Sequence, residues 1–139
     1  MKTTSIQVES RTERLIAVRD FVSEAARTAG FGDEDISKIA LAVDEACTNI
    51  IKHAYRSDPT KIIQVHVSAG NGSFVVAIQD EGIQFNPTQV QPPDMKEYLT
   101  HYRRGGLGVH LMKSLMDRVE YSIAPGKANE VRLIKNLPR

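Results

Sequence analysis

Three polar residues are spaced four apart in the stretch DEACTNIIKHAY, residues 44–55. Residues four apart share one face of a helix, so Glu45, Asn49 and His53 would form a polar line along it. An acid, an amide and an imidazole in such a line can bind a ligand or accept a proton. The same spacing fits an ordinary solvated face, and this stretch alone does not separate the two interpretations.

A second group lies in the stretch IQDEG, where alternating apolar residues end in Asp80 and Gly82 follows. A carboxylate at a strand end can accept a hydrogen bond from an exocyclic amine, and a glycine lets the backbone approach a ligand closely. The alternative is a plain β-turn, in which aspartate and glycine are both common.

Three glycines, Gly105, Gly106 and Gly108, open a helical pattern in the stretch RRGGLGVHL. Backbone N–H groups at a helix start can bind an anion, assisted by about half a positive charge from the helix dipole. The spacing matches neither the lysine-containing phosphate loop nor the dinucleotide pattern, which disfavours both common nucleotide folds. A flexible hinge before the helix is the alternative.

Apolar periodicity predicts the elements that must position these groups. Alternation predicts a strand over 3–10, a hairpin that turns at Asn71 and Gly72, and a final hairpin of 119–124 with 130–137. Helical spacing predicts a helix over 11–29 that ends at Gly30, and a second that begins with Asp33 as N-cap and ends before Pro59. The third predicted helix follows the glycines and has one face formed by Leu107, Leu111, Ser114 and Leu115.

These elements predict an α+β two-layer sandwich, with a mixed, mainly antiparallel sheet and helices packed on one face. The 139 residues are 41% hydrophobic and 25% charged with a net charge of +1, which suits one globular domain. No polybasic run points to nucleic acid, and no apolar run is long enough to span a membrane. Cys47 is the one cysteine, which excludes an internal disulfide. We therefore expect a soluble cytoplasmic protein without direct nucleic-acid or membrane partners.

Residues 86–104 have no apolar periodicity and contain Pro87, Pro92 and Pro93. This is long for a connection without secondary structure, and such segments are usually functional lids or disordered.

The three motifs, in this order, resemble those of the histidine-kinase-like ATP-binding domains, the GHKL superfamily with the Bergerat ATP-binding fold. The resemblance to bacterial anti-sigma factor serine/threonine kinases is closer. DEACTNIIKHAY is similar to their asparagine motif, DEGIQFNP to their D-x-G-x-x-F-[DN]-P motif, and GGLGVHLMKSLMDRVEY to their second glycine motif. The resemblance extends from Ile6 to Leu137 and implies a single ATP-binding domain over 1–139, with an ATP lid over 86–104.

The resemblance implies a role for each matching residue. Asn49 would coordinate Mg²⁺ that bridges the phosphates of ATP. Glu45 would be the general base for the attacking hydroxyl, and Arg104 would neutralise charge on the transferred phosphoryl group. The residues implied to contact the nucleotide are Asn49, His53, Asp80 (at the adenine amine), Gly82, Phe85, Gly105, Gly106, Leu107, Gly108 and Asn129.

Two positions depart from the superfamily pattern. Gln84 stands where many members have a second glycine, which the anti-sigma branch often lacks as well. Asn129 stands where family members often have a threonine that touches a phosphate. An amide can donate the same hydrogen bond, so the resemblance leaves a phosphate contact at Asn129 open.

The resemblance implies an ATP- and Mg²⁺-dependent protein serine/threonine kinase that acts as an anti-sigma factor. Its partners would be a sigma factor and an anti-anti-sigma protein with a STAS domain, and it would form a homodimer that includes the strand over 3–10. The alternative is a partner-switch module in which ATP or ADP is a conformational ligand and no phosphate is transferred. Glu45 favours the kinase, because a pure switch has no need of a base. A scaffold without nucleotide would leave the combined motifs unexplained.

Overall fold

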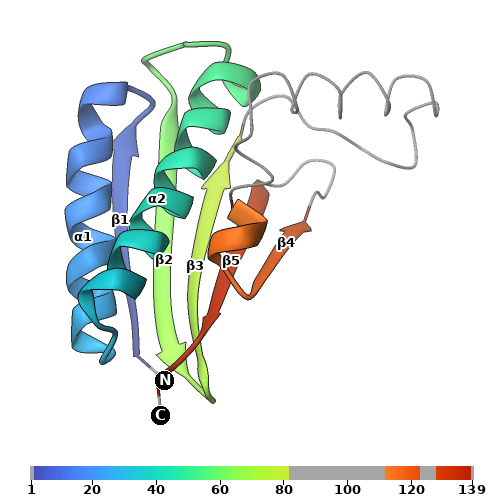
Figure 1. The fold of residues 1–139 in the computed structure, drawn as a ribbon. Helices are drawn as coiled ribbons and strands as arrows, with labels where there is room; N and C mark the ends of the chain where they lie inside the picture. The colour runs from blue at the N-terminus through green and yellow to red at the C-terminus, as the bar shows by residue number, and fades with distance from the viewer. Residues whose placement is uncertain (1, 82–111, 123–127, 139) are drawn as a thin grey trace.

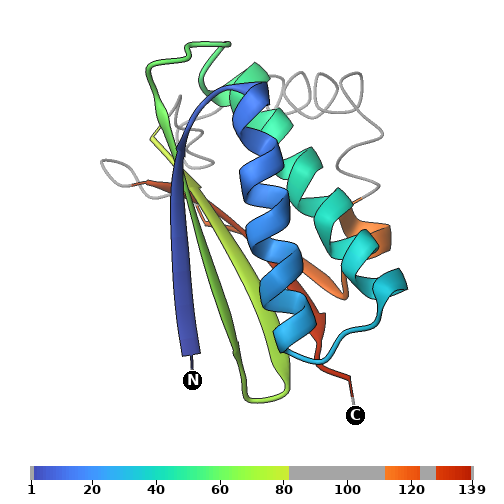
Figure 2. The ribbon, with the colours of Figure 1, turned by 90° about the vertical axis from the view of Figure 1, so that its left-hand side faces the viewer.

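The computed structural model describes residues 2–81, 112–122 and 128–138. Its sheet has five strands in the order β1-β2-β3-β5-β4, and all four pairings between them are antiparallel. The strands are β1 Lys2–Glu9, β2 Ile62–Gly70, β3 Ser73–Asp80, β4 Arg118–Ser122 and β5 Asn129–Asn136. The helices α1 (Leu15–Thr28) and α2 (Asp33–Asn49) lie side by side on one face of the sheet (Figure 1 and Figure 2). The predicted α+β two-layer sandwich with a mainly antiparallel sheet is confirmed.

The β2–β3 hairpin forms where the sequence predicts it. Asn71 and Gly72 have φ angles of 53° and 79°, so both turn residues lie in the left-handed region that a two-residue hairpin turn requires. The alternating apolar residues of both strands face the helices and are buried: Ile63, Val65, Val67, Phe74, Val76 and Ile78. The final hairpin is confirmed by the pairing of β4 with β5. Its connection, 123–127, lies outside the described residues.

A short 3₁₀ turn, Thr12–Arg14, leads into α1, which ends at the predicted glycine. Gly30 has a φ of 102° and donates its N–H to the Arg27 carbonyl at 3.0 Å. The next N–H, of Phe31, bonds to the Ala26 carbonyl at 3.1 Å. These two bonds form a Schellman motif, which turns the chain back toward α2.

The prediction of Asp33 as the N-cap of α2 is wrong by one residue. Gly32 is the N-cap, because its carbonyl accepts the first helical bond, from Ile36 N–H at 2.9 Å. Asp33 is the first helical residue, and its carboxylate accepts a hydrogen bond from Arg27 at 3.3 Å. Its charge still lies in the first turn, where it stabilises the helix dipole.

The core lies between the helix layer and the sheet. Near the β2–β3 turn, the rings of Phe31 and Phe74 meet edge to face, with centroids 5.4 Å apart. The apolar stripe of α2 and the turn after it is buried along its whole length: Ile36, Ile39, Ala40, Val43, Ala46, Cys47, Ile50 and Ile51.

The third predicted helix is described only over Met112–Leu115, which is helical. Met112 and Met116 are buried here, whereas Ser114 is exposed. Of the predicted face, Leu115 is half-buried, and the buried positions here are the two methionines four residues apart. Leu107 and Leu111 lie outside the described residues.

Candidate functional site

The polar line on α2 is not an ordinary solvated face. Asn49, the last residue of α2, is only 7% exposed, while Glu45 one turn earlier is half-buried. A solvated face would leave the Asn49 amide in water. Its burial indicates a side chain held for a specific partner, since buried polar groups are nearly always hydrogen-bonded.

The buried amide of Asn49 has an unsatisfied donor. Among the described residues three buried side-chain polar atoms lack a hydrogen-bond partner, and they are Asn49 Nδ2, Asn129 Oδ1 and Ser10 Oγ. Leaving such an atom unpaired costs about 1–3 kcal/mol. Two of the three belong to residues predicted to contact the nucleotide, which is the pattern expected where a polar ligand completes the hydrogen bonding.

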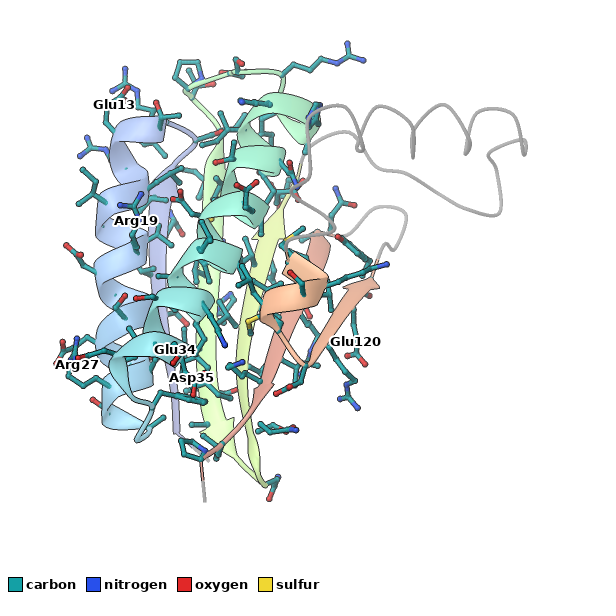
Figure 3. All side chains as sticks on the ribbon, viewed as in Figure 1. Glu13, Arg19, Arg27, Glu34, Asp35 and Glu120 are labelled. Carbon is teal, nitrogen blue, oxygen red and sulfur yellow. The ribbon has the colours of Figure 1, made fainter. Side chains whose placement is uncertain are left out.

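The acid next to Glu45 has a different role. Asp44 accepts a hydrogen bond from Arg19 at 3.0 Å, which ties α2 to α1. The first-turn acids Glu34 and Asp35 lie near the opposite end of α2 (Figure 3). Glu45 is therefore the acid of α2 placed one turn from Asn49 and not engaged in the α1–α2 contact.

The helix changes geometry directly after Asn49. Residues Ile50–Ala54 form a π-helix, in which the Tyr55 N–H bonds to the Ile50 carbonyl at 2.9 Å. The expectation of an α-helix continuing through this segment is wrong here, because the Tyr55 N–H bonds to a carbonyl five residues back instead of four. His53 lies in this π-helical turn and is half-buried. Single π-helical turns often occur at functional sites.

Asp80 ends β3 and is 7% exposed. Its side chain shares the face of Val76 and Ile78, so it points to the helix layer. The C-terminal end of α2 and the end of β3 lie at the same end of the molecule (Figure 1). The structure therefore brings Asp80 to the end of the domain that carries Asn49 and His53.

Asn129, the first residue of β5, lies opposite Asp80 in the strand register. Its Nδ2 donates a hydrogen bond to Asp80 Oδ1 at 3.0 Å. Asn129 therefore contacts the carboxylate predicted to bind adenine. The Oδ1 of Asn129 is the second buried atom without a partner, and it adds an acceptor beside Asp80.

Tyr55 is a site residue that sequence reasoning missed. Its hydroxyl donates to the Ile62 carbonyl at 2.6 Å and accepts the Glu81 N–H at 2.7 Å, directly after Asp80. Burial is the main cause that raises the pKa of the Tyr55 phenol. The hydrogen bond from the Glu81 N–H lowers this pKa, while the charges of Asp80 and Glu81 raise it. The phenol is therefore neutral at pH 7. The sequence signal that could have identified Tyr55 is its hydroxyl on an otherwise apolar ring, directly before a turn.

The remaining predicted site residues lie outside the described part of the chain. They are Gly82, Phe85, Arg104, Gly105, Gly106, Leu107 and Gly108, together with the predicted lid over 86–104.

A known protein family matches nearly the whole chain, including the elements that carry these residues. The histidine kinase-like ATPase domain matches residues 8–135. The chain belongs to this family.

Relatives of this histidine kinase-like ATPase domain include proteins named serine-protein kinase RsbW. Those of Bacillus mycoides strain KBAB4 and Bacillus cereus strain AH820 are each 29% identical over 119 residues, covering 83% of this chain and 74% of the relative. Among solved structures, the RsbU and RsbW domains of Rv1364c from Mycobacterium tuberculosis match with a TM-score of 0.69 at 19% identity. That match covers all of this chain and 33% of the other, so this chain spans one third of its length, and the likeness shows the fold.

The described residues fit a nucleotide with a magnesium ion. They contain no cluster of three or more histidine, cysteine, aspartate or glutamate side chains that could hold a metal by itself. Mg²⁺ in phosphate sites typically takes one or two protein oxygens and completes its shell with phosphate and water. The side-chain oxygen of Asn49 would be one such ligand, whereas its unpaired Nδ2 is a donor that suits a phosphate or water oxygen. Among the helices of the described residues, none is long and apolar enough to cross a membrane.

Proposed function

We propose that this chain is an ATP- and Mg²⁺-dependent protein serine/threonine kinase that acts as an anti-sigma factor. Its substrate would be an anti-anti-sigma protein with a STAS domain, and it would also sequester a sigma factor in the cytoplasm. The observation that carries the proposal is the buried Asn49, whose Nδ2 lacks a hydrogen-bond partner, with Glu45 one turn before it. Family membership and the relatives named serine-protein kinase support it.

At the phosphate end of the site, Asn49 would hold Mg²⁺ through its amide oxygen. The bound ion would neutralise charge on the phosphates. Glu45, one helical turn away, would orient the serine hydroxyl of the substrate and accept its proton. His53, in the following π-helical turn, would flank the nucleotide.

At the base end, Asp80 would accept a hydrogen bond from the adenine amine, with Asn129 fixing the carboxylate. By resemblance, Gly82 and Phe85 would contact the adenine base. The N–H groups of Gly105, Gly106, Leu107 and Gly108 would bind the phosphates, and Arg104 would stabilise charge on the transferred group. Residues 86–104 would close over the nucleotide as a lid.

The proposal includes a homodimer. β1 pairs with β2 along one edge, and its other edge has no partner strand among the described residues. An open strand edge is a ready surface for pairing with a second chain. Sedimentation of the purified protein tests this part, and a monomer at all concentrations would contradict it.

The decisive experiment mixes the protein with γ-phosphate-labelled ATP, Mg²⁺ and a purified anti-anti-sigma protein that has a STAS domain. We expect label on a serine or threonine of the partner, and none when Mg²⁺ is chelated. Tight ATP binding without transfer to any such partner would overturn the kinase and leave the partner-switch module. Absence of ATP binding would overturn both.

A further inference from the structure

The Tyr55 hydroxyl occupies a rung of the β2–β3 ladder. The ladder's last pair at this end is Gln64 with Gln79, and the same register continued by two residues would pair Ile62 with Glu81. Instead, the Tyr55 hydroxyl lies between them, donating to the Ile62 carbonyl at 2.6 Å and accepting the Glu81 N–H at 2.7 Å. A side chain from the helix layer therefore replaces the direct strand-to-strand hydrogen bond.

This insertion fixes the peptide that follows Asp80. The Glu81 N–H belongs to the peptide unit that joins Asp80 to Glu81, so the tyrosine holds the backbone on the β2 side of Asp80. On the other side, Asn129 of β5 holds the carboxylate at 3.0 Å. Two elements therefore hold Asp80 in place: β5 of the sheet through Asn129, and the helix layer through Tyr55.

The backbone after Tyr55 adopts a conformation that residues other than glycine disfavour. Arg56 and Ser57 have φ angles of 48° and 62°, a left-handed pair without glycine. The Ser57 N–H bonds to the Ile51 carbonyl at 2.7 Å, which closes the π-helical segment. Strained conformations of this kind persist where the surrounding structure over-determines them.

We propose that Tyr55 is a positioning residue for 6-aminopurine recognition: by bridging Ile62 and Glu81 it holds Asp80 where the carboxylate accepts a hydrogen bond from the exocyclic amine. The proposal rests on the proposed function, because it takes the ligand of Asp80 to be adenine. Tyr55 itself is buried at 6% exposure and acts through the Glu81 peptide.

The test compares Tyr55→Phe with the unchanged protein in calorimetric binding of ATP and of purine riboside triphosphate, which lacks the 6-amino group. Loss of the bridge should lower ATP affinity roughly tenfold, the effect of one poorly placed polar partner. Affinity for the purine analogue should be unchanged, since that ligand makes no bond to Asp80. Equal losses for both ligands, or no loss for either, would overturn the positioning role.

Two controls separate positioning from stability. Val22→Ala removes buried volume from α1, which is distant in sequence from the end of β3. It should destabilise the fold without changing the ratio of the affinities for ATP and for the purine analogue. In a chain that already carries Asp80→Ala, adding Tyr55→Phe should cost no further ATP affinity, because coupled residues are non-additive. A full additional loss in that double variant would contradict the proposal.

Hydrogen exchange of the unchanged protein gives a second measurement that needs no variant. ATP should slow exchange of the Glu81 amide more than purine riboside triphosphate does, because only ATP tightens Asp80. Equal protection by the two ligands would contradict the role of Tyr55 while leaving ATP binding intact. Failure of the unchanged protein to bind either ligand would instead overturn the proposed function, and this inference with it.

Discussion

Asn129 donates a hydrogen bond to Asp80 across the antiparallel pair of β3 and β5, with 3.0 Å between Nδ2 and Oδ1. The bond places the buried Oδ1 of Asn129, which has no hydrogen-bond partner, beside the Asp80 carboxylate. An amino group that carries two hydrogens satisfies two such acceptors. In the proposed site a carbonyl oxygen in the same place would face only acceptors, so we expect the pair to favour an amine over a carbonyl.

The first prediction follows from this pair of acceptors. Asp80→Asn should weaken ATP binding by about 1–3 kcal/mol and reduce the preference for ATP over GTP, because GTP carries a carbonyl where adenine has its amine. Calorimetric titration of both nucleotides measures it. Asp20→Asn makes the same change on an exposed position of α1 and should alter neither affinity. Equal affinity of the unchanged protein for ATP and GTP would remove Asp80 from the base end of the site.

Sequence patterns predicted most of the fold because turns, helix ends and buried faces depend on residues that are close together in the chain. The hairpin at Asn71 and Gly72 follows from the left-handed backbone that its turn requires, and the end of α1 follows from the same freedom at Gly30. The buried face of α2 follows from spacing alone. At the site, the burial of Asn49 and Asp80 agrees with their selection from the motifs.

The features that sequence reasoning missed depend on contacts between distant residues. The role of Tyr55 depends on bonds to Ile62 and Glu81, which no periodicity within the helix reveals. The place of Asn129 depends on the register between β3 and β5. Family resemblance identifies the residue type at that position but not its hydrogen bond to Asp80.

The second prediction concerns the alkaline stability of the core. Burial, with a smaller contribution from Asp44, raises the pKa of the Cys47 thiol from 9.0 to about 12. Between these values the folded state keeps a proton that the unfolded state has lost. The stabilisation is therefore complete below pH 9, and the free energy of unfolding should fall as pH rises, by about 1.4 kcal/mol per pH unit from this group.

Denaturant unfolding at pH 8, 9 and 10 checks this expectation. Cys47→Ala should lower stability at every pH, because it removes buried volume, but its stability should decline less steeply above pH 9. Parallel pH profiles for the two proteins would show that the thiol does not ionise differently on unfolding.

The third prediction concerns the backbone after Tyr55. Arg56 has a φ of 48°, a conformation that costs a residue with a side chain about 1–2 kcal/mol and costs glycine almost nothing. Arg56→Gly should stabilise the protein by about 0.5–1 kcal/mol, after the greater flexibility of unfolded glycine is subtracted. Asn71→Gly is the matched control: it changes another left-handed residue, but asparagine tolerates that region, so no gain is expected. Similar gains for both variants in thermal unfolding would refute the strain at Arg56.

The last prediction separates the kinase from the switch, and it depends on two residues one turn apart on α2. Glu45→Ala should leave Mg²⁺-ATP affinity nearly unchanged and lower phosphoryl transfer roughly 10²–10⁴-fold, because a base acts on the substrate hydroxyl and not on ATP. Asn49→Ala should lose Mg²⁺-ATP binding itself, since it removes the proposed metal ligand. Binding of a sigma factor should survive Glu45→Ala.

The chain offers a matched control in the neighbouring acid. Asp44→Ala removes a carboxylate that is bound to Arg19 in the α1–α2 contact, so it should lower stability slightly and leave transfer at the unchanged protein's rate. Radiolabel on the partner serine is the measurement, with nucleotide affinity determined on the same preparations. If Glu45→Ala labels its partner as fast as Asp44→Ala, then Glu45 is not the base. A loss of ATP affinity in Glu45→Ala equal to that in Asn49→Ala would place the glutamate in nucleotide binding instead.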